Sequence, residues 1–328
     1  MGVNLRDVAK RAGVSVATAS RVLNGHPQVS EETRRKVLAA AEQLGYKVED
    51  ARPRRHLTHR VISLIVPDVS SPFYCAILQG VEREAFSQQF DLVLYTTEGR
   101  SQVNVVERVA SAKNISGVIV VTPRHGEDRY LREIGAQLPV VVVDHRAEGS
   151  GFPHVTVDNL RAGFQATSYL IAQGHRRIGF VSGPLNIESA RDRLRGYRLA
   201  LDEANIPFDE QLVLEGDFEQ PTGYRLLKEW IAANPQPDAW FCSNDLMAAG
   251  AIQALVEHGI SVPEDVAVMG FDDLSVAQMT QPRLTTMRQP IQEMGTIAIR
   301  LLLRLLDGEE LETNRIVLNA ELVVRESA

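Results

Sequence analysis

The chain has 328 residues, enough for two or three domains, and 44% of them are hydrophobic, which supplies a substantial core. Residues 1–60 hold 12 Lys and Arg against 6 Asp and Glu, a net charge of +6, whereas residues 61–328 carry −13. A basic N-terminal segment followed by an acidic remainder is typical of a protein whose first domain contacts nucleic acid. No apolar run approaches a membrane span and no secretory signal is recognised, so we expect a cytoplasmic protein without a membrane partner.

The sequence offers no catalytic or metal-binding constellation. Cys75 and Cys242 lack metal-type spacing and are predicted to be reduced core thiols. His56 and His59 lie three residues apart in a basic segment, where histidines are more often solvated than metal-bound. Phosphate-binding glycine loops, the dinucleotide fingerprint and the nucleophile elbow are absent. We therefore expect no enzyme activity, no metal and no cofactor.

Residues 4–25 have the pattern of two short helices joined by a tight turn. Asn4 is an N-cap before apolar residues at helical spacing, and Gly13 can take the positive φ that ends a helix. Ser15 caps the second helix, and a third helix is predicted to follow Ser30. This pattern is typical of a helix-turn-helix, whose second helix enters the major groove. A plain three-helix bundle is the alternative, and the local positive charge argues against it.

The segment Val-Ala-Lys-Arg-Ala-Gly-Val-Ser-Val-Ala-Thr-Ala-Ser-Arg-Val-Leu-Asn, residues 8–24, resembles the headpiece of the lactose/galactose repressor (LacI/GalR) family of bacterial transcription regulators. The resemblance extends along nearly the full length. By match to the family motif, the base-reading positions are Val16, Ala17 and Arg21. Arg21 can pair bidentately with guanine, whereas Val16 and Ala17 can only contact or exclude a thymine methyl group.

Contacts to the DNA backbone are predicted at polar positions of the second helix and in the linker, namely Ser15, Thr18, Ser20, Asn24, Arg52, Arg54 and Arg55. The linker departs from the family pattern, because Val48 replaces a proline, Pro53 interrupts the hinge helix and Arg55 stands where a leucine is usual. We therefore expect the linker to act on phosphates or the minor groove through charge, with little leucine-driven kinking.

The body alternates strand and helix signals in two series. Strands are predicted over residues 61–66, 92–96, 118–122, 140–144, 178–182, 212–215, 239–242 and 266–271. Helices lie between them, for example over residues 73–87, 101–114 and 128–137. Continuous Val and Ile runs separated by helices indicate parallel strands that are buried on both faces. The fold class is therefore an all-α helix-turn-helix headpiece followed by a two-lobed, doubly wound α/β domain, which the resemblance implies is periplasmic-binding-protein-like.

The resemblance implies that the chain crosses between the lobes near residues 158–161, near Pro290 and again close to the C-terminus. The expected domains are a headpiece at 1–46, a linker at 47–60, a first lobe at about 61–158 plus 291–318, and a second lobe at about 159–290 plus 319–328. The C-terminus carries no added leucine-heptad tail, which favours a homodimer over a tetramer. A two-fold dimer would read a near-palindromic operator.

Ligands of two-lobed α/β domains bind at the carboxyl ends of the strands. The candidate effector-binding residues are the polar or aromatic side chains near these ends: Phe73, Tyr74, Asp144, Arg193, Phe218, Asn244 and Asp272. In the family that the chain resembles, these positions line the effector pocket. Arg and carboxylate groups suit vicinal hydroxyls, and aromatic rings suit an apolar sugar face. For Asp245, which opens a helix, we expect N-capping instead.

The sequence thus predicts a DNA-binding transcriptional regulator, a repressor, that is controlled allosterically by a small-molecule effector, a sugar or sugar phosphate. A nucleoside- or purine-responsive regulator shares the same chemistry of hydroxyls and rings. A solute-binding module without DNA-binding activity is the other alternative, and it would require a degraded headpiece.

Overall fold

The computed structural model describes residues 5–23, 29–44, 60–97, 105, 108–109, 111–112, 114–122, 128–145 and 151–328. The contacts divide the chain into two units, Met1–His59 and Arg60–Ala328. Among the described residues, no helix is both long enough and apolar enough to cross a membrane.

The first unit contains the helices α1 (Leu5–Ala12), α2 (Val16–Leu23) and α3 (Glu31–Gln43), as the sequence predicts. Gly13 has a φ of +67° and ends α1, which turns the chain into α2. The buried core is made of small and branched side chains, which allow the helices to pack closely: Val8, Ala9, Ala19, Val22, Leu23, Val37, Ala40 and Ala41. The apolar spacing of the sequence therefore produces a compact helix-turn-helix.

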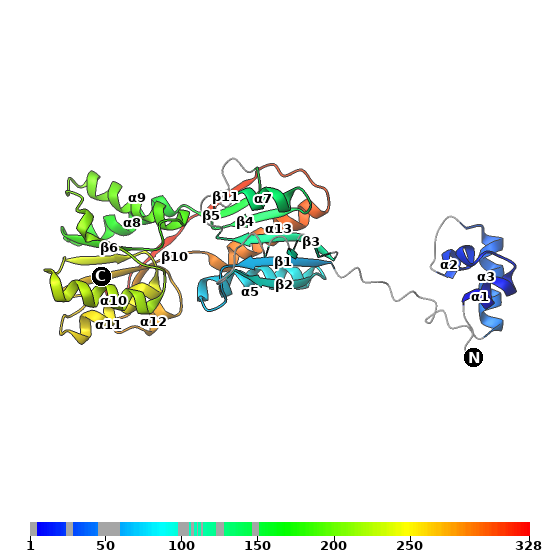
Figure 1. Ribbon diagram of the computed structural model, residues 1–328, viewed down its shortest axis with the longest axis horizontal. Helices are drawn as coiled ribbons and strands as arrows, with labels where there is room; N and C mark the ends of the chain where they lie inside the picture. Colours follow the sequence, from blue (N-terminus) through cyan, green and yellow to red (C-terminus); the bar gives the residue numbers. More distant parts are fainter. Residues whose placement is uncertain are drawn as a thin grey trace. The chain divides into compact units, whose positions relative to one another are not determined.

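The first lobe of the second unit is built on one parallel sheet (Figure 1). Its strands are β1 (Val61–Val66), β2 (Asp91–Thr96), β3 (Ile115–Val121), β4 (Val140–Val143), β5 (His154–Val157) and β11 (Arg315–Leu318). Their order across the sheet is β11-β5-β4-β3-β1-β2. Most side chains of β1, β3, β4 and β5 are buried, because both faces of the sheet are covered.

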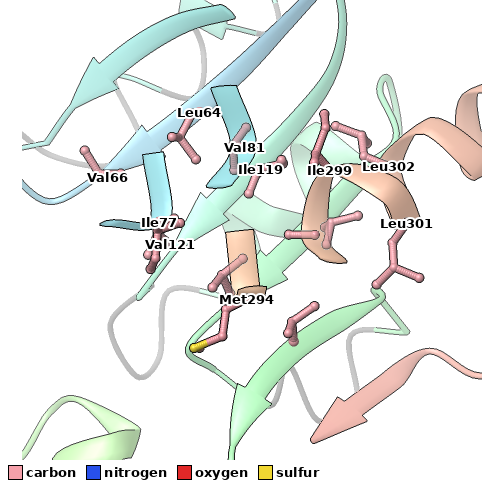
Figure 2. Close-up of a cluster of buried hydrophobic side chains, with 14 of the residues drawn as sticks. Leu64, Val66, Ile77, Val81, Ile119, Val121, Met294, Ile299, Leu301 and Leu302 are labelled. Carbon is pink, nitrogen blue, oxygen red and sulfur yellow. The ribbon is translucent and has the colours of Figure 1, made fainter. Parts of the chain in front are cut away.

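Helices α5 (Pro72–Ser87) and α13 (Ile291–Leu306) pack on one face of this sheet, and α7 (Asp128–Gly135) packs on the other. Figure 2 shows side chains of α13, from the far end of the chain, in one cluster with Ile119 of β3, among them Met294, Ile299 and Leu302. Gly80 permits the close approach of α5 to α13, since a Cβ there would lie 2.0 Å from the Gln292 carbonyl oxygen. The first lobe therefore includes a helix, α13, that follows most of the second lobe along the chain.

The second lobe repeats the plan. Its strands are β6 (Ile178–Ser182), β7 (Val213–Glu215), β8 (Ala239–Cys242), β9 (Ala267–Asp272), β10 (Thr285–Arg288) and β12 (Glu321–Val323). They follow the order β12-β10-β9-β8-β6-β7, with β12 antiparallel to β10. The remaining elements are α8 (Asn159–Ala172), α9 (Glu188–Glu203), a 3-10 turn (Glu210–Leu212), α10 (Gln220–Ala233), α11 (Asp245–Glu257) and α12 (Val276–Met279). Figure 1 shows α8 and α9 over one face of the sheet and α10 and α11 over the other.

The chain passes between the two sheets after β5, after β10 and between β11 and β12. The resemblance implied passages near residues 158–161, near Pro290 and close to the C-terminus, and the domain limits stay a prediction. The two lobes are therefore joined by three connections.

Two details differ from the expectations. The short strands β5, β10, β11 and β12 were not predicted, because each has only three or four residues and depends on pairing with distant strands. Both cysteines are free thiols, and Cys242 is buried in β8. Cys75 is only partly buried, so its placement in the core was wrong; it lies in the first turn of α5, where the helix leaves the sheet edge. The helix expected over residues 101–114 lies largely outside the described residues.

Candidate ligand pocket and nucleic-acid interface

A cavity of about 280 Å³ lies between the two lobes of the second unit. Its described lining combines side chains of the first lobe with side chains of the second: Pro67, Asp68, Ser71, Phe73, Tyr74, Thr97, Thr122, Asp144, Pro184, Ile187, Ser189, Arg193, Asp217, Phe218, Glu219, Asn244 and Asp272. All seven candidate effector-binding residues are in this lining. The structure therefore brings together side chains that lie up to 199 positions apart in sequence.

Several lining residues hold an unusual backbone conformation at the ends of strands. Thr122 follows β3 with a φ of 47°, Asp144 follows β4 with a φ of 58°, and Asp272 ends β9 with a φ of 114°. Phe218, after β7, has a φ of 72°. Residues other than glycine rarely adopt these angles, and such strain concentrates at functional sites. Here the strain turns the side chains at the strand ends towards the cavity.

Arg193 is the central cation of the cavity and is 3% exposed. Its Nε donates to Asn159 Oδ1 at 2.9 Å, and its Nη1 donates to the Ser243 carbonyl oxygen at 2.6 Å. Nη1 also lies 3.8 Å from Asp272 Oδ1, and the guanidinium stacks 3.8 Å from the centre of the Phe271 ring. Burial lowers the pKa of Arg193, while the surrounding carboxylates oppose that shift. These contacts fix the guanidinium in one orientation.

Asp144 is held by donors from both lobes. Its Oδ2 accepts from the Thr122 hydroxyl at 3.1 Å and from the Ser189 hydroxyl at 3.2 Å. Its Oδ1 is buried and accepts no hydrogen bond from the described residues. Burial raises the pKa of Asp144, and Arg193 counteracts the rise. A buried oxygen without a donor is costly, so this atom can accept a hydrogen bond from an occupant of the cavity.

Asp272 occupies the opposite wall. Its Oδ1 accepts from the Gln289 side-chain amide at 2.6 Å. Burial raises the pKa of Asp272 to about 7, against the opposing influence of Arg193 and this hydrogen bond. Asp144 adds to the rise through charge repulsion. The carboxyl group is therefore poised to exchange a proton near neutral pH.

Aromatic rings supply the apolar walls. Phe73 and Tyr74 form an edge-to-face pair with ring centres 5.4 Å apart. The Phe218 ring lies over Gly183, where an added Cβ would come within 2.1 Å of it. Burial raises the pKa of Tyr74, so its hydroxyl stays protonated. The cavity thus combines fixed polar groups with rings that can stack on an apolar ligand face.

The expectation for Asp245 was wrong, because α11 begins at Asp245 itself, one residue earlier than a cap at Asp245 requires. Asn244 is the N-cap: its Oδ1 accepts from the Met247 amide at 3.0 Å, and its Nδ2 donates to the Phe218 carbonyl oxygen at 2.8 Å. Asp245 is instead fully buried and accepts from the Leu274 amide at 2.7 Å and the Thr286 hydroxyl at 2.5 Å. Asp245 therefore ties α11 to the strands β9 and β10.

Sequence reasoning missed lining residues that the structure supplies, among them Thr97, Thr122, Ile187 and Ser189. Thr97 and Thr122 follow β2 and β3 directly, so the rule that selected Asp144 could have found them. Ser189 carries no such signal, because it reaches Asp144 only through the packing of the second lobe against the first. Among the described residues, no group of three His, Cys, Asp or Glu side chains could hold a metal ion.

The headpiece presents the start of α2 as predicted. The Ser15 hydroxyl oxygen accepts from the Thr18 amide at 3.0 Å, so Ser15 caps the helix, and it lies 2.8 Å from the Thr18 hydroxyl. Val16 is 43% exposed, which leaves it accessible to a base edge. The side chains of Ala17, Ser20 and Arg21 and the whole of Asn24, Arg52, Arg54 and Arg55 lie outside the described residues, as does Pro53.

Comparisons with known proteins cover both units. Residues 4–48 match the family described as "Bacterial regulatory proteins, lacI family", and residues 167–328 match the periplasmic binding protein-like domain. The chain is 34% identical to the HTH-type transcriptional regulator RegA of Clostridium saccharobutylicum, covering 100% of this chain and 99% of the relative. It is also 34% identical to the HTH-type transcriptional repressor CytR of Escherichia coli (strain K12), covering 98% and 95% of the two chains.

Solved structures agree with this assignment. The transcriptional regulator CelR–cellobiose complex matches with a TM-score of 0.75 and 35% identity, covering 99% of this chain and 100% of that one. The lac repressor dimer bound to operator and the anti-inducer ONPF matches with a TM-score of 0.76 and 28% identity, covering 100% and 99%. The chain belongs to the lacI family of bacterial regulatory proteins, and it is a transcriptional regulator with a helix-turn-helix DNA-binding domain and a periplasmic-binding-protein-like ligand-binding domain.

Proposed function

We propose that this chain is a repressor that binds a near-palindromic operator as a homodimer in the bacterial cytoplasm. Its operator affinity is controlled by a small ligand, a sugar or sugar phosphate, held in the cavity between the lobes. One observation carries this proposal: the lining comes from both lobes, so an occupant contacts both and favours one arrangement of them. The site binds its ligand without converting it, so the protein acts as a switch and not as an enzyme.

The polar contacts to the ligand come from four side chains, Asp144, Arg193, Asn244 and Asp272. The unpartnered Oδ1 of Asp144 supports its role as an acceptor for a ligand hydroxyl. Asn244 already uses both of its side-chain polar atoms within the protein, so its contribution is to position Phe218 and to accept one further bond. Phe73, Tyr74 and Phe218 form the walls on which the apolar face of the ligand stacks.

In the headpiece, Arg21 reads guanine, while Val16 and Ala17 contact thymine methyl groups. Ser15, Thr18, Ser20 and Asn24 hold phosphates at the start and end of α2. The linker arginines, Arg52, Arg54 and Arg55, add charge along the backbone.

Binding to DNA that flanks the gene, measured by fluorescence anisotropy, tests the proposal. Arg21→Ala is expected to weaken operator binding roughly 5- to 150-fold, because a bidentate pair contributes about 1–3 kcal/mol. Arg35→Ala, at an exposed position of α3, serves as the matched control and is expected to change affinity far less. The proposal fails if no near-palindrome in that DNA binds more tightly than a scrambled duplex.

A further inference from the structure

We propose that the cavity accepts an uncharged, hydroxyl-rich effector and rejects phosphorylated compounds. This inference rests on the proposed function and narrows its ligand to unphosphorylated sugars or nucleosides. The relevant feature is the set of helix ends around the cavity. Four described helices, α5, α9, α10 and α11, have their N-cap residue in its lining: Ser71, Ile187, Glu219 and Asn244. Helix N-termini are the usual protein sites for phosphate, since their free amides and dipoles attract anions.

At α5 and α10 the protein already places its own carboxylate where a phosphate would bind. Asp68 Oδ1 accepts from the backbone amides of Ser70 at 2.8 Å and Ser71 at 3.0 Å, directly before α5. Asp217 Oδ1 accepts from the Glu219 amide at 2.9 Å, and its Oδ2 accepts from the Thr222 hydroxyl at 2.7 Å, at the start of α10. An anion that approached the start of α5 or α10 would therefore meet a resident negative charge.

The other two helix starts also carry a polar side chain of the protein. Asn244 Oδ1 accepts from the Met247 amide at the start of α11. Glu188 is an acidic residue in the first turn of α9, and its carboxylate lies 3.0 Å from His145 Nδ1. A side chain therefore caps α11, whereas α5, α9 and α10 have no side-chain cap hydrogen bond but each begin beside a carboxylate of the chain.

The charges of the lining point the same way. Among the described lining residues, Arg193 is the single Lys or Arg. Five others carry carboxyl groups: Asp68, Asp144, Asp217, Glu219 and Asp272. Arg193 already donates to Asn159 and Ser243 and faces Asp272, so part of its charge is balanced within the protein. A second anion beside like charges in a partly enclosed site is disfavoured.

The titration of Asp272 supports this view. Burial, with a further contribution from Asp144, raises the pKa of Asp272 to about 7. Near neutral pH the Asp272 carboxylate therefore takes up a proton, which lowers the negative charge of the cavity. An uncharged polyol avoids this cost, because its hydroxyl groups donate to the carboxylates. The buried Asp144 Oδ1, which accepts no hydrogen bond from the described residues, is suited to such a donor.

Phosphate binding to the full-length chain provides a test that requires no knowledge of the effector. Inorganic phosphate is titrated at constant ionic strength against the native chain and against the double variant Asp68→Asn/Asp217→Asn, with binding followed by calorimetry. Asparagine retains an oxygen that can accept the same amide hydrogen bonds, so the local turns are preserved. The control is Asp209→Asn/Glu210→Gln, which removes two exposed charges at the 3-10 turn away from the cavity lining.

The double variant is expected to bind phosphate roughly tenfold more tightly than the native chain, whereas the control stays native-like. Equal affinity of the native chain and the double variant would overturn the inference. Matched pairs then test the ligand class by thermal shift and operator release: cellobiose and cellobiose 6-phosphate, glucose and glucose 6-phosphate, adenosine and adenosine monophosphate. The phosphorylated member of any active pair is expected to bind at least 100-fold more weakly.

A phosphorylated compound that binds as tightly as its parent would also overturn the inference, and if that compound releases the operator, the proposed function still stands. The opposite combination is also informative. If phosphate binding follows the expectation but no ligand alters DNA binding, the charge selectivity is supported and the proposed function is not. The two failures are therefore distinguishable. Within the active pairs, a response to cellobiose or glucose indicates a sugar, and a response to adenosine indicates a nucleoside.

Discussion

The Ser189 hydroxyl donates a hydrogen bond to Asp144 Oδ2 at 3.2 Å, and this contact joins helix α9 of one lobe to the end of β4 in the other. The next residues along each segment also meet, since His145 Nδ1 lies 3.0 Å from Glu188 Oε2. Both contacts border the cavity and belong to one cross-lobe seam. An occupant that bonds to Asp144 therefore acts directly on a contact between the two lobes.

Removing the Ser189 hydroxyl tests the seam. Ser189→Ala is expected to lower the free energy of unfolding by about 1–3 kcal/mol, because it leaves a buried carboxylate with one donor fewer. Urea denaturation measures the change. The control is Ser87→Ala, whose hydroxyl donates to the Glu84 carbonyl oxygen at an exposed site and whose loss should cost less than about 0.5 kcal/mol. Equal losses of unfolding free energy in the two variants would show that the cross-lobe hydrogen bond stabilises the chain no more than an exposed one.

Asp272 predicts a pH dependence of stability. Its pKa is raised from an ordinary value of 3.8 to about 7 in the folded chain, so the folded state holds a proton that the unfolded state has released. The resulting stabilisation is fully present below about pH 4 and is lost as the pH rises through 7, at up to about 1.4 kcal/mol per pH unit for one proton.

Asp272→Asn should flatten this slope, and urea denaturation between pH 5 and pH 8 measures it. Some slope will remain, because burial also raises the pKa values of Asp144 and Asp245. Asp307→Asn, at an exposed site that ends α13, should retain the native slope. A native chain whose stability rises over this range would contradict the assignment.

The crossing of α8 and α9 depends on glycine. A Cβ at Gly196 would lie 2.2 Å from the Leu160 carbonyl oxygen, and one at Gly163 would lie 2.6 Å from the Arg193 carbonyl oxygen. Either alanine substitution is expected to destabilise the chain by about 1–3 kcal/mol, although alanine favours helices intrinsically. Thermal unfolding measures the loss. Gln165→Ala, exposed on α8, should be neutral, and a stabilised Gly196→Ala variant would show that the helices can separate without cost.

The basic linker should contribute charge and little sequence readout. Arg54→Ala combined with Arg55→Ala is expected to lower operator affinity and to reduce the slope of log K against log salt by about 1.8, the value for two lost phosphate contacts. Anisotropy titrations over a salt series measure both quantities. Arg132→Ala, exposed on α7, should leave the slope unchanged. A double variant with the native slope would remove the linker from the DNA contacts.

Much of the cavity could be predicted because parallel strands bring their carboxyl ends to one edge of a sheet. That rule selected Asp144 and Asp272, and the same apolar patterning located the main helices and the buried strands. The rule fails where the exact start of a helix decides what a side chain does. Because α11 starts at Asp245, Asn244 caps the helix and Asp245 is buried against the Leu274 amide. It also fails for Ser189, whose partner lies 45 residues away on the other lobe.

The short strands β5, β10, β11 and β12 were missed for a related reason. Three or four residues carry too little periodicity to identify a strand, and pairing with a distant neighbour supplies the rest of the stabilisation. The strained φ of Phe218 is likewise invisible in the sequence, since only the surrounding structure maintains it.

The most direct test of the account is the linkage between the cavity and the operator. Operator affinity is measured by anisotropy with and without an unphosphorylated compound that stabilises the native chain, alongside the cavity variant Phe218→Ala and the headpiece variant Arg21→Ala. The account predicts that the compound changes the operator affinity of the native chain at least fivefold. The Phe218→Ala variant should bind operator without this response. The Arg21→Ala variant should still bind the compound but lose operator affinity. A compound that occupies the cavity and leaves native operator affinity unchanged would contradict it.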